Sequence, residues 1–397
     1  MFVKILGKKG VNGMAEKEYR RLSLLVDDIP LYVVDREIAP LKEELESFLE
    51  GMSYMKSRKF SRDVLFSHEI QANNVIEGYY DDVSLVDNVI HRKLDISDEQ
   101  RKRRILNLYK GYRYILTSGK AINRENLKEL YGILSDGLLE AGDIANMGEY
   151  YRNEDVFIFY SDRMDIEPDK GVPAKEIEKY MSILLEYMSK KKTDGTLTDT
   201  YLVSQVAHFY FCYIHPYYDI NGRTSRTTAM WYLLNPGAYP YIIFNRGIQQ
   251  SKQRYYKIIR DVKKYKNVTF FLNYMMASLK AELEKEHIME LIAQSCRHKL
   301  SSLDYQTMQY ILSMNGQITY ADFARFYNSQ NEHKKLPEIF DTMIAPMIDK
   351  GVIVPTTSTS KTYRSGLQNS FFELNPSMYE IDPAKIKRIN LVQNKNN

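Results

Sequence analysis

The chain has 397 residues, more than one ordinary hydrophobic core accommodates, so two or three domains are expected. Hydrophobic residues make up 44% of the chain and charged residues 27%, which is the composition of a soluble globular protein. With 55 basic and 51 acidic side chains, the net charge is only +4, so no overall field indicates binding to nucleic acid or to an anionic membrane.

Cysteine usage and hydropathy suggest a reducing compartment. Cys212 and Cys296 are the two cysteines, too few for a disulfide framework. No apolar run reaches the roughly 18 residues that a membrane span needs. The segment from Met1 to Tyr19 lacks an apolar core of secretory length. We therefore expect a cytoplasmic protein without a membrane span.

The N-terminal part of the chain is predicted to be mostly helical. Residues 1–60 are expected to be peripheral, with a helix near residues 37–58. Residues 63–78 and residues 123–139 are each expected to form a further helix.

Between these two segments, Ser97-Asp98-Glu99 is typical of a capped helix start, and the helix is expected to continue toward Leu116. The helix runs through the basic residues 101–104. Because acidic residues precede this run, a solvated helix face is favoured over a nucleic-acid patch.

The helical pattern breaks at residues 148–158, which predicts a short β-hairpin or an extended segment. Helices are expected again over residues 174–190, 201–214 and 223–234. The connection between the last two of these helices contains the residues most informative about function.

His215 follows the apolar helix, and Pro216 disfavours the helical conformation at His215, so the imidazole is expected at a helix end. A histidine titrates near neutral pH and can act as general base for a hydroxyl nucleophile. Asp219, four residues on, is the kind of hard oxygen ligand that Mg²⁺ uses together with substrate phosphates.

Asn221-Gly222 can form a turn that directs consecutive N–H groups toward an anion, and Gly222 is expected at a helix N-terminus, which favours phosphate. Arg223 and Arg226 are three residues apart and therefore neighbours on the first turn, where two guanidinium groups suit a di- or triphosphate. Each part has a structural alternative on its own: a helix-end histidine, a plain turn, a solvated arginine pair. Together, in this order, they favour a nucleotide site.

The C-terminal third changes pattern. A helix from residue 253 to about 264 and a long helix over 268–295 are followed by three shorter helices and two strands around a polar segment. This is the order of a winged-helix module. The expected elements are helices at residues 305–314, 320–327 and 337–350, and strands at 351–354 and 370–374.

The third helix of this module is poorly suited to bind DNA phosphates, because its charges balance and it contains Pro346. A protein-contact or vestigial role is therefore favoured over DNA binding, although Lys361 and Arg364 argue for DNA. The balancing charges are Lys334, Lys335 and Lys350 against Glu338, Asp341 and Asp349.

The stretch from His215 to Arg226 resembles the signature of Fic-domain proteins, His-x-Phe-x-(Asp/Glu)-Gly-Asn-Gly-Arg-x-x-Arg. Tyr217 stands where the family has Phe, and Ile220 stands where it has Gly. The resemblance extends over roughly residues 60–290.

This resemblance implies transfer of AMP from ATP, with Mg²⁺, to a Ser, Thr or Tyr hydroxyl of a protein. In that scheme His215 takes the hydroxyl proton and Asp219 holds Mg²⁺. Asn221 and Gly222 form the anion hole, and Arg223 and Arg226 hold the outer phosphates. At Ile220 we expect an ordinary backbone conformation, so that the side chain only changes the pocket wall.

Upstream, Asn73-Asn74-Val75-Ile76-Glu77-Gly78 resembles the inhibitory motif of the family, (Ser/Thr)-x-x-x-Glu-(Gly/Asn), with Asn73 in the Ser/Thr position. The resemblance implies that Glu77 pairs with Arg226 and occupies the guanidinium meant for the γ-phosphate. The structural alternative is a helix-end glutamate followed by a glycine C-cap.

Other residues take roles from the resemblance alone. The hairpin near residues 148–158 would be the flap that receives the target as an added strand, with Gly148 and Arg152 leading into it. Tyr256 would border the nucleobase. Lys263 stands where the family often has Asn, so base recognition can differ.

We therefore predict a mainly α protein with a Fic helical core, a short β-hairpin flap and a C-terminal winged helix. The expected function is that of a protein adenylyltransferase inhibited by Glu77. A deAMPylase, a transferase of another nucleotide and a nucleotide-sensing DNA-binding regulator are the alternatives. Self-modification and a homodimer are further expectations. The expected domains are residues 1–60 (extension), 61–295 (Fic), 296–380 (winged helix) and 381–397 (flexible tail).

Overall fold

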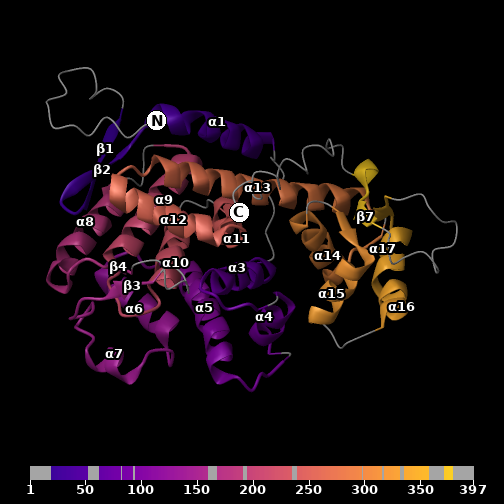
Figure 1. Cartoon of the computed structure of the whole chain (residues 1–397), viewed down its shortest axis with the longest axis horizontal. Coiled ribbons are helices and arrows are strands. Elements are labelled where there is room, and N and C mark those ends of the chain that lie inside the picture. The colour runs from indigo at the N-terminus through magenta and orange to yellow at the C-terminus, as the bar shows by residue number, and fades with distance from the viewer. Residues whose placement is uncertain are drawn as a thin grey trace.

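The computed structural model describes most of the chain and is mainly helical, as predicted. It shows a larger helical body and a smaller C-terminal module, which share one long helix, α13 (Figure 1). The described residues are 19–51, 62–81, 83–92, 94–159, 168–190, 195–234, 239–296, 298–314, 317–330, 335–356 and 371–378.

The first described element is a β-hairpin that the sequence analysis did not predict. Strand β1 (Arg20–Val26) pairs with antiparallel β2 (Ile29–Val33). Alternate side chains of β1 point inward, and Leu24 is fully buried in the main core. The turn places Asp27 and Asp28 at positive φ, as a two-residue hairpin loop requires. The expectation that residues 1–60 are peripheral is therefore wrong for residues 19–51.

The main body is a set of helices packed around α9 and α10, which meet at the predicted signature. Predicted helix ends are confirmed by their caps: the Asp98 side chain accepts from the N–H of Arg101, and that of Asn123 from the N–H of Asn126. The helices are α1 (Asp35–Gly51), α3 (Arg62–Ile76), α4 (Val83–Ile90), α5 (Glu99–Thr117), α6 (Arg124–Ser135), α7 (Ala141–Ala145), α8 (Ile177–Lys190), α9 (Leu197–Ile214), α10 (Asn221–Leu234), α11 (Phe244–Gln249), α12 (Lys252–Tyr265) and α13 (Thr269–Ser295).

Helix α9 is buried on nearly every side because its sequence is apolar around its whole circumference. A capping box starts it, in which Thr196 and Asp199 satisfy each other's backbone N–H groups. Its position fixes where His215, the next residue, enters the body. Within the described residues, no helix is both long and apolar enough to cross a membrane.

Helix α3 rests on the main body through a buried polar cluster as well as apolar contacts. Glu69 is fully buried, with Asn245 and Arg246 of α11 and Glu282 of α13 around it. Burial raises the pKa of Glu69 to about 8, and the charge of Arg246 offsets this only in part. The carboxyl group is therefore protonated at neutral pH.

Because the pKa of Glu69 is raised in the folded state, the free energy of unfolding should depend on pH. The unfolded Glu69 carboxyl titrates near 4.5, so its contribution to stability is complete below that value and is lost as the pH rises toward 8. The Glu69→Gln variant should lose less stability than the wild type between pH 5 and pH 8. Urea unfolding of both proteins at the two pH values measures this, and parallel curves would contradict it.

The C-terminal module has its own hydrophobic cluster, to which the last turns of α13 contribute Ile288 and Ile292. Its three-stranded antiparallel sheet has the order β5-β7-β6. The elements are α14 (Ser302–Ser313), β5 (Gln317–Thr319), α15 (Tyr320–Gln330), α16 (Leu336–Ile339), a short π-helical segment (Phe340–Ile344), α17 (Ala345–Asp349), β6 (Ile353–Pro355) and β7 (Phe371–Leu374).

The third helix of the module departs from the prediction of one continuous helix over residues 337–350. It contains a short π-helical segment at Phe340–Ile344, just before Pro346. Proline lacks an N–H and its ring clashes with the carbonyl four residues earlier, which accounts for the wider turn. Lys334, Lys361 and Arg364 lie outside the described residues, and the division of the chain near residue 296 stays our proposal.

Candidate active site

His215 lies directly after α9, as predicted, but its backbone is left-handed rather than extended, with φ 53° and ψ 61°. Its N–H still donates to the carbonyl of Phe211 at 3.0 Å. The imidazole is partly buried, and burial lowers the pKa of His215 to about 4. The ring is therefore neutral at pH 7, which is the form that accepts a proton.

Arg152 holds the backbone of His215 in this conformation. Its buried guanidinium donates to the carbonyls of His215 at 2.8 Å, Glu154 at 2.5 Å and Val172 at 2.6 Å. A Cβ at Gly171 would lie 2.7 Å from Nη2 of Arg152, so only glycine leaves room for this contact. The sequence analysis connected Arg152 with the flap but did not predict its contact with the loop after α9.

The flap lies farther along the chain than predicted. Strand β3 (Phe157–Ile158) pairs with antiparallel β4 (Asp169–Lys170), so no complete hairpin lies within residues 148–158. Lys263 of α12 binds β4, donating to the carboxylate of Asp169 and, at 2.8 Å, to the carbonyl of Lys170. Lys263 was expected to affect base recognition, whereas here its ammonium group contacts the flap.

Ile220 has φ +65°, so the expectation of an ordinary backbone conformation at this position is wrong. Its N–H donates to Oδ1 of the exposed Asp219 at 2.5 Å. The left-handed conformation costs a β-branched residue about 1–2 kcal/mol. The Ile220 side chain is 1% exposed and packs in the main core, which offsets this strain.

These magnitudes predict the effect of restoring glycine at this position. Removing a buried isoleucine side chain costs about 2–5 kcal/mol even in replacement by alanine. Since this exceeds the strain relieved, Ile220→Gly should lower the free energy of unfolding by about 1–3 kcal/mol. Urea unfolding measures it, and a stabilised variant would show that strain outweighs packing.

Asn221 and Gly222 begin α10, where the prediction put a helix N-terminus. The Asn221 side chain binds the backbone of Tyr217 at both ends, accepting from its N–H at 2.9 Å and donating to its carbonyl at 2.8 Å. It therefore shapes the loop. A Cβ at Gly222 would lie 2.4 Å from Oε1 of Glu77, so glycine is required for the approach of that carboxylate.

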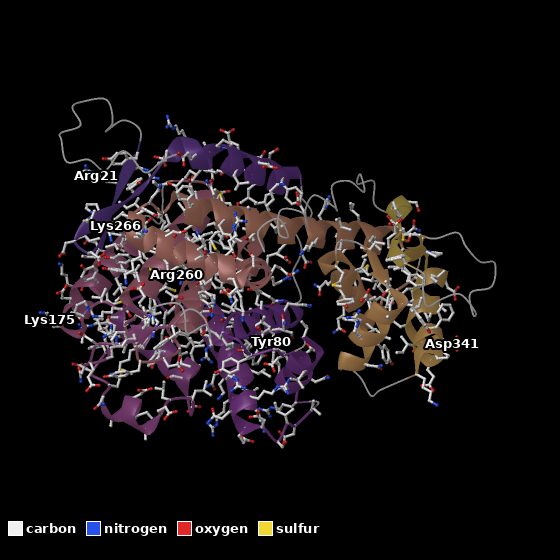
Figure 2. The ribbon with its side chains drawn as sticks, viewed as in Figure 1. Arg21, Tyr80, Lys175, Arg260, Lys266 and Asp341 are labelled. Carbon is white, nitrogen blue, oxygen red and sulfur yellow. The ribbon has the colours of Figure 1, made fainter. Side chains whose placement is uncertain are left out.

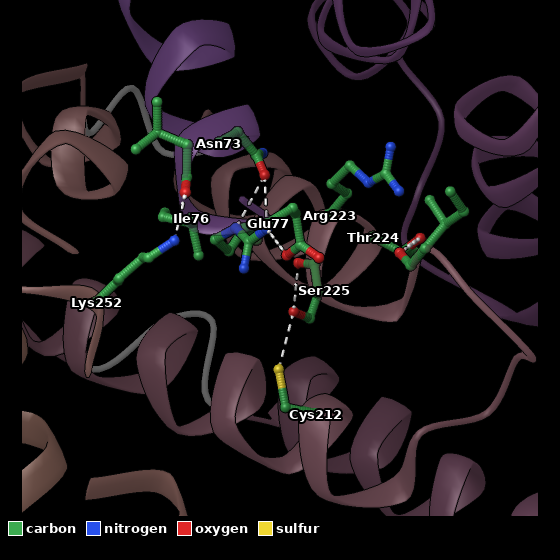
Figure 3. Close-up of polar contacts among 12 residues, drawn as sticks. Asn73, Ile76, Glu77, Cys212, Arg223, Thr224, Ser225 and Lys252 are labelled. Carbon is green, nitrogen blue, oxygen red and sulfur yellow. Dashed lines mark hydrogen bonds and ion pairs between the residues drawn. The ribbon is translucent and has the colours of Figure 1, made fainter. Parts of the chain in front are cut away.

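Arg226 is buried, and the upstream motif binds two of its guanidinium nitrogens. Its Nε and Nη2 donate to Oδ1 of Asn73 at 3.0 and 2.7 Å, and Nη2 donates to Oε1 of Glu77 at 2.5 Å. Figure 3 shows Asn73 and Glu77 side by side at this contact. Asn73, in the Ser/Thr position of the motif, thus supplies the second acceptor.

A helix-terminating turn holds Glu77 in place. The N–H of Tyr79 donates to the carbonyl of Asn74, the N–H of Gly78 donates to that of Val75, and Gly78 has φ +93°. This is a Schellman motif. The glycine C-cap and the contact with Arg226 therefore occur together. Burial acts to raise the pKa of Glu77, but Arg226 and Arg223 outweigh it, so the pKa is lowered and the carboxylate is ionised.

Arg223 differs from Arg226 because it forms no direct ion pair with a carboxylate of the described residues, although its charge acts on Glu77. Its side chain is buried, and Nε and Nη1 have no hydrogen-bond partner among the described residues. Figure 3 shows its guanidinium apart from the contacts of Asn73 and Glu77. Tyr256 was expected to border a base, and its hydroxyl donates to the carbonyl of Ile76 at 2.8 Å. Tyr256 therefore contacts the end of α3.

Comparison with known proteins agrees with this geometry. The family model described as Fic/DOC family matches residues 121–233, which include the whole stretch from His215 to Arg226. Residues 121–233 of the chain therefore form a Fic domain. A curated relative, Protein adenylyltransferase Fic of Nematostella vectensis, is 25% identical over 210 residues, which are 51% of this chain and 44% of the relative. The chain thus spans less than half the length of that relative.

Among solved structures, a Fic family protein from Desulfovibrio desulfuricans G20 matches with a TM-score of 0.55 and 20% sequence identity. The match covers 85% of this chain and 95% of that chain. It confirms the mainly helical Fic fold that the sequence analysis predicted.

Proposed function

We propose that the protein transfers AMP from ATP to a hydroxyl group of a protein side chain. The observation that carries this proposal is the buried guanidinium of Arg223 at the first turn of α10, whose Nε and Nη1 lack a hydrogen-bond acceptor among the described residues. Buried N–H donors without acceptors are costly, and a phosphate at the helix N-terminus is the ligand that suits them. The relative named a protein adenylyltransferase supports the same reaction.

The loop after α9 supplies the group that accepts a proton. As the hydroxyl oxygen forms its bond to the α-phosphorus, the bond from that phosphorus to the β-phosphate bridging oxygen breaks and pyrophosphate leaves. Neutral His215 takes the hydroxyl proton, since burial keeps its pKa near 4. The left-handed backbone, held by Arg152, fixes the imidazole for this role.

Asp219 is the residue that would hold Mg²⁺. Its exposed carboxylate is a hard oxygen donor on the same loop, and phosphates supply the further oxygens that Mg²⁺ prefers. When bound, the ion offsets phosphate charge. Gly222 and Arg223 would hold the phosphate chain through backbone and guanidinium N–H groups.

The contact between Glu77 and Arg226 supports self-inhibition. The carboxylate binds Nη2 of the guanidinium that would otherwise bind the γ-phosphate, and Asn73 binds Nε and Nη2 beside it. ATP then binds in an unproductive position until α3 moves. Because the pKa of Glu77 is lowered below 4.5, mild acid does not release it.

The direct test is incubation with Mg²⁺ and ATP labelled on the α-phosphate, alone and in a cell lysate. Label on protein hydroxyls that survives denaturation supports AMP transfer. Label from another nucleotide instead would reassign the substrate, and removal of label from an AMPylated protein would favour the reverse reaction.

For the C-terminal module we propose a protein-contact role on a winged-helix fold. Glu338 and Asp341 on its third helix are exposed, and Figure 2 shows Asp341 at the outer edge of the module. Lys350 is instead paired with Asp304 at 2.7 Å. This surface repels DNA phosphates. Salt-dependent binding to duplex DNA would overturn the proposal.

A further inference from the structure

The ring of Tyr79 lies against two guanidinium groups from different helices. Its centroid is 4.0 Å from Cζ of Arg104, on α5, and 5.9 Å from Cζ of Arg223, on α10. Tyr79 is the last residue of the Schellman turn that positions Glu77. One short turn therefore covers Arg104, Arg223 and Arg226.

Arg104 differs from its neighbours in the basic run at residues 101–104. Arg101 and Lys102 pair with Asp81 and Asp95, each at about hydrogen-bond distance, and Arg103 is exposed. By contrast, Nε of Arg104 is buried and has no hydrogen-bond partner in the described parts of the chain. Arg104 is therefore only partly solvated, whereas Arg103 is exposed.

An aromatic ring is an incomplete partner for these two cations. Its face attracts a guanidinium group but offers no lone pairs to the N–H donors. Phosphate oxygens satisfy such donors directly and with charge assistance. Two guanidinium groups that each have a buried N–H donor without an acceptor, and that face one partly exposed ring, are therefore suited to a phosphate chain.

We propose that Arg104 is a further binding residue for the outer phosphates of the nucleotide, and that Tyr79 covers Arg104 and Arg223 while Glu77 occupies Arg226. This proposal rests on the proposed function. Tyr79 is 38% exposed, and its neighbour Tyr80 is 72% exposed and lies at the surface (Figure 2). The turn can therefore move away from these arginines without opening the hydrophobic core. This movement would expose Arg104, Arg223 and Arg226 together.

Binding of inorganic tripolyphosphate, measured by titration calorimetry, tests the role of Arg104. All variants are made in the full chain carrying Glu77→Gly. Arg104→Gln should weaken binding about tenfold or more, the loss expected for a charge-assisted hydrogen bond. Arg103→Gln, which removes the same charge from the exposed neighbour, should stay within about twofold. Equal affinities of these two variants would overturn the proposal.

Removal of the ring tests the covering role. In the chain with Glu77 intact, Tyr79→Ala should tighten tripolyphosphate binding a few-fold, and adding Arg104→Gln should abolish most of that gain. An unchanged affinity would show that Tyr79 covers nothing the ligand needs.

Thermal unfolding of each variant shows whether it still folds, and a conservative variant separates the charge of Arg104 from its donor geometry. Arg104→Lys keeps the charge but not the planar donor pair, so an intermediate loss is expected. Since tripolyphosphate binding requires no AMP transfer, the proposal can fail while labelling with ATP succeeds. A Glu77→Gly chain that binds tripolyphosphate but labels nothing would instead count against the proposed function alone. No binding of tripolyphosphate by that chain would overturn the role of Arg104.

Discussion

Replacing Glu77 by glycine is expected to raise AMP transfer by about 5- to 150-fold, the range of coupling energies of about 1–3 kcal/mol. The variant removes the carboxylate that accepts from Arg226 at 2.5 Å. Arg226 then has only the neutral Asn73 amide as partner, which a γ-phosphate displaces readily. Initial rates of label transfer from α-labelled ATP, at equal protein concentration, measure the effect.

The chain offers a matched control for this substitution. Glu50 also precedes a glycine at the end of a helix, α1, and its side chain is exposed. Glu50→Gly should leave the rate within about twofold of the wild type, because surface substitutions rarely matter. If Glu77→Gly gave the same rate as Glu50→Gly, Glu77 would be a structural helix cap and not an inhibitor.

Replacing His215 by alanine in the Glu77→Gly background should reduce transfer by about 10²- to 10⁴-fold, the usual contribution of a general base. Nucleotide binding should change little, because the proposed phosphate contacts come from residues on α10 and α5 and not from His215. The combination of a lost rate and a retained affinity separates a chemical role from a binding role. His91→Ala, at an exposed position after α4, is the control.

The pH profile of the Glu77→Gly variant provides a second measure of His215. A histidine with an ordinary pKa would lose its basic form below about pH 6.5. Because burial lowers the pKa of His215 to about 4, kcat/KM should stay level from neutral pH to about pH 5 and fall only below that. A midpoint near pH 6.5 would show that the imidazole is exposed in the active form.

The sequence predicted the parts of the site that depend on spacing along one segment. His215, Asp219, Gly222 and Arg226 lie where their spacing put them, at the end of α9 and the start of α10. The pairing of Glu77 with Arg226 was also predicted, but only from resemblance, since the two residues are far apart in the chain.

The features that the sequence did not predict depend on how segments far apart in the chain pack against one another. The positive φ of Ile220 follows from the path of the loop, which residue type alone does not specify. Arg104 lies in a charged run, and only the packing of α5 against the turn of Tyr79 distinguishes it from Arg103. The alternation of Leu22, Leu24 and Val26 is typical of a strand, and this signal and the two-residue Asp turn were both missed.

The link between Glu77 and Arg226 is intramolecular, which has a consequence for any kinetic study of this protein. Glu77 acts as a tethered ligand, whose effective concentration at Arg226 is set by α3 and its glycine turn and not by the amount of protein. Dilution therefore leaves the occupancy of Arg226 unchanged. A partner that binds α3 in its displaced position would lower that effective concentration directly.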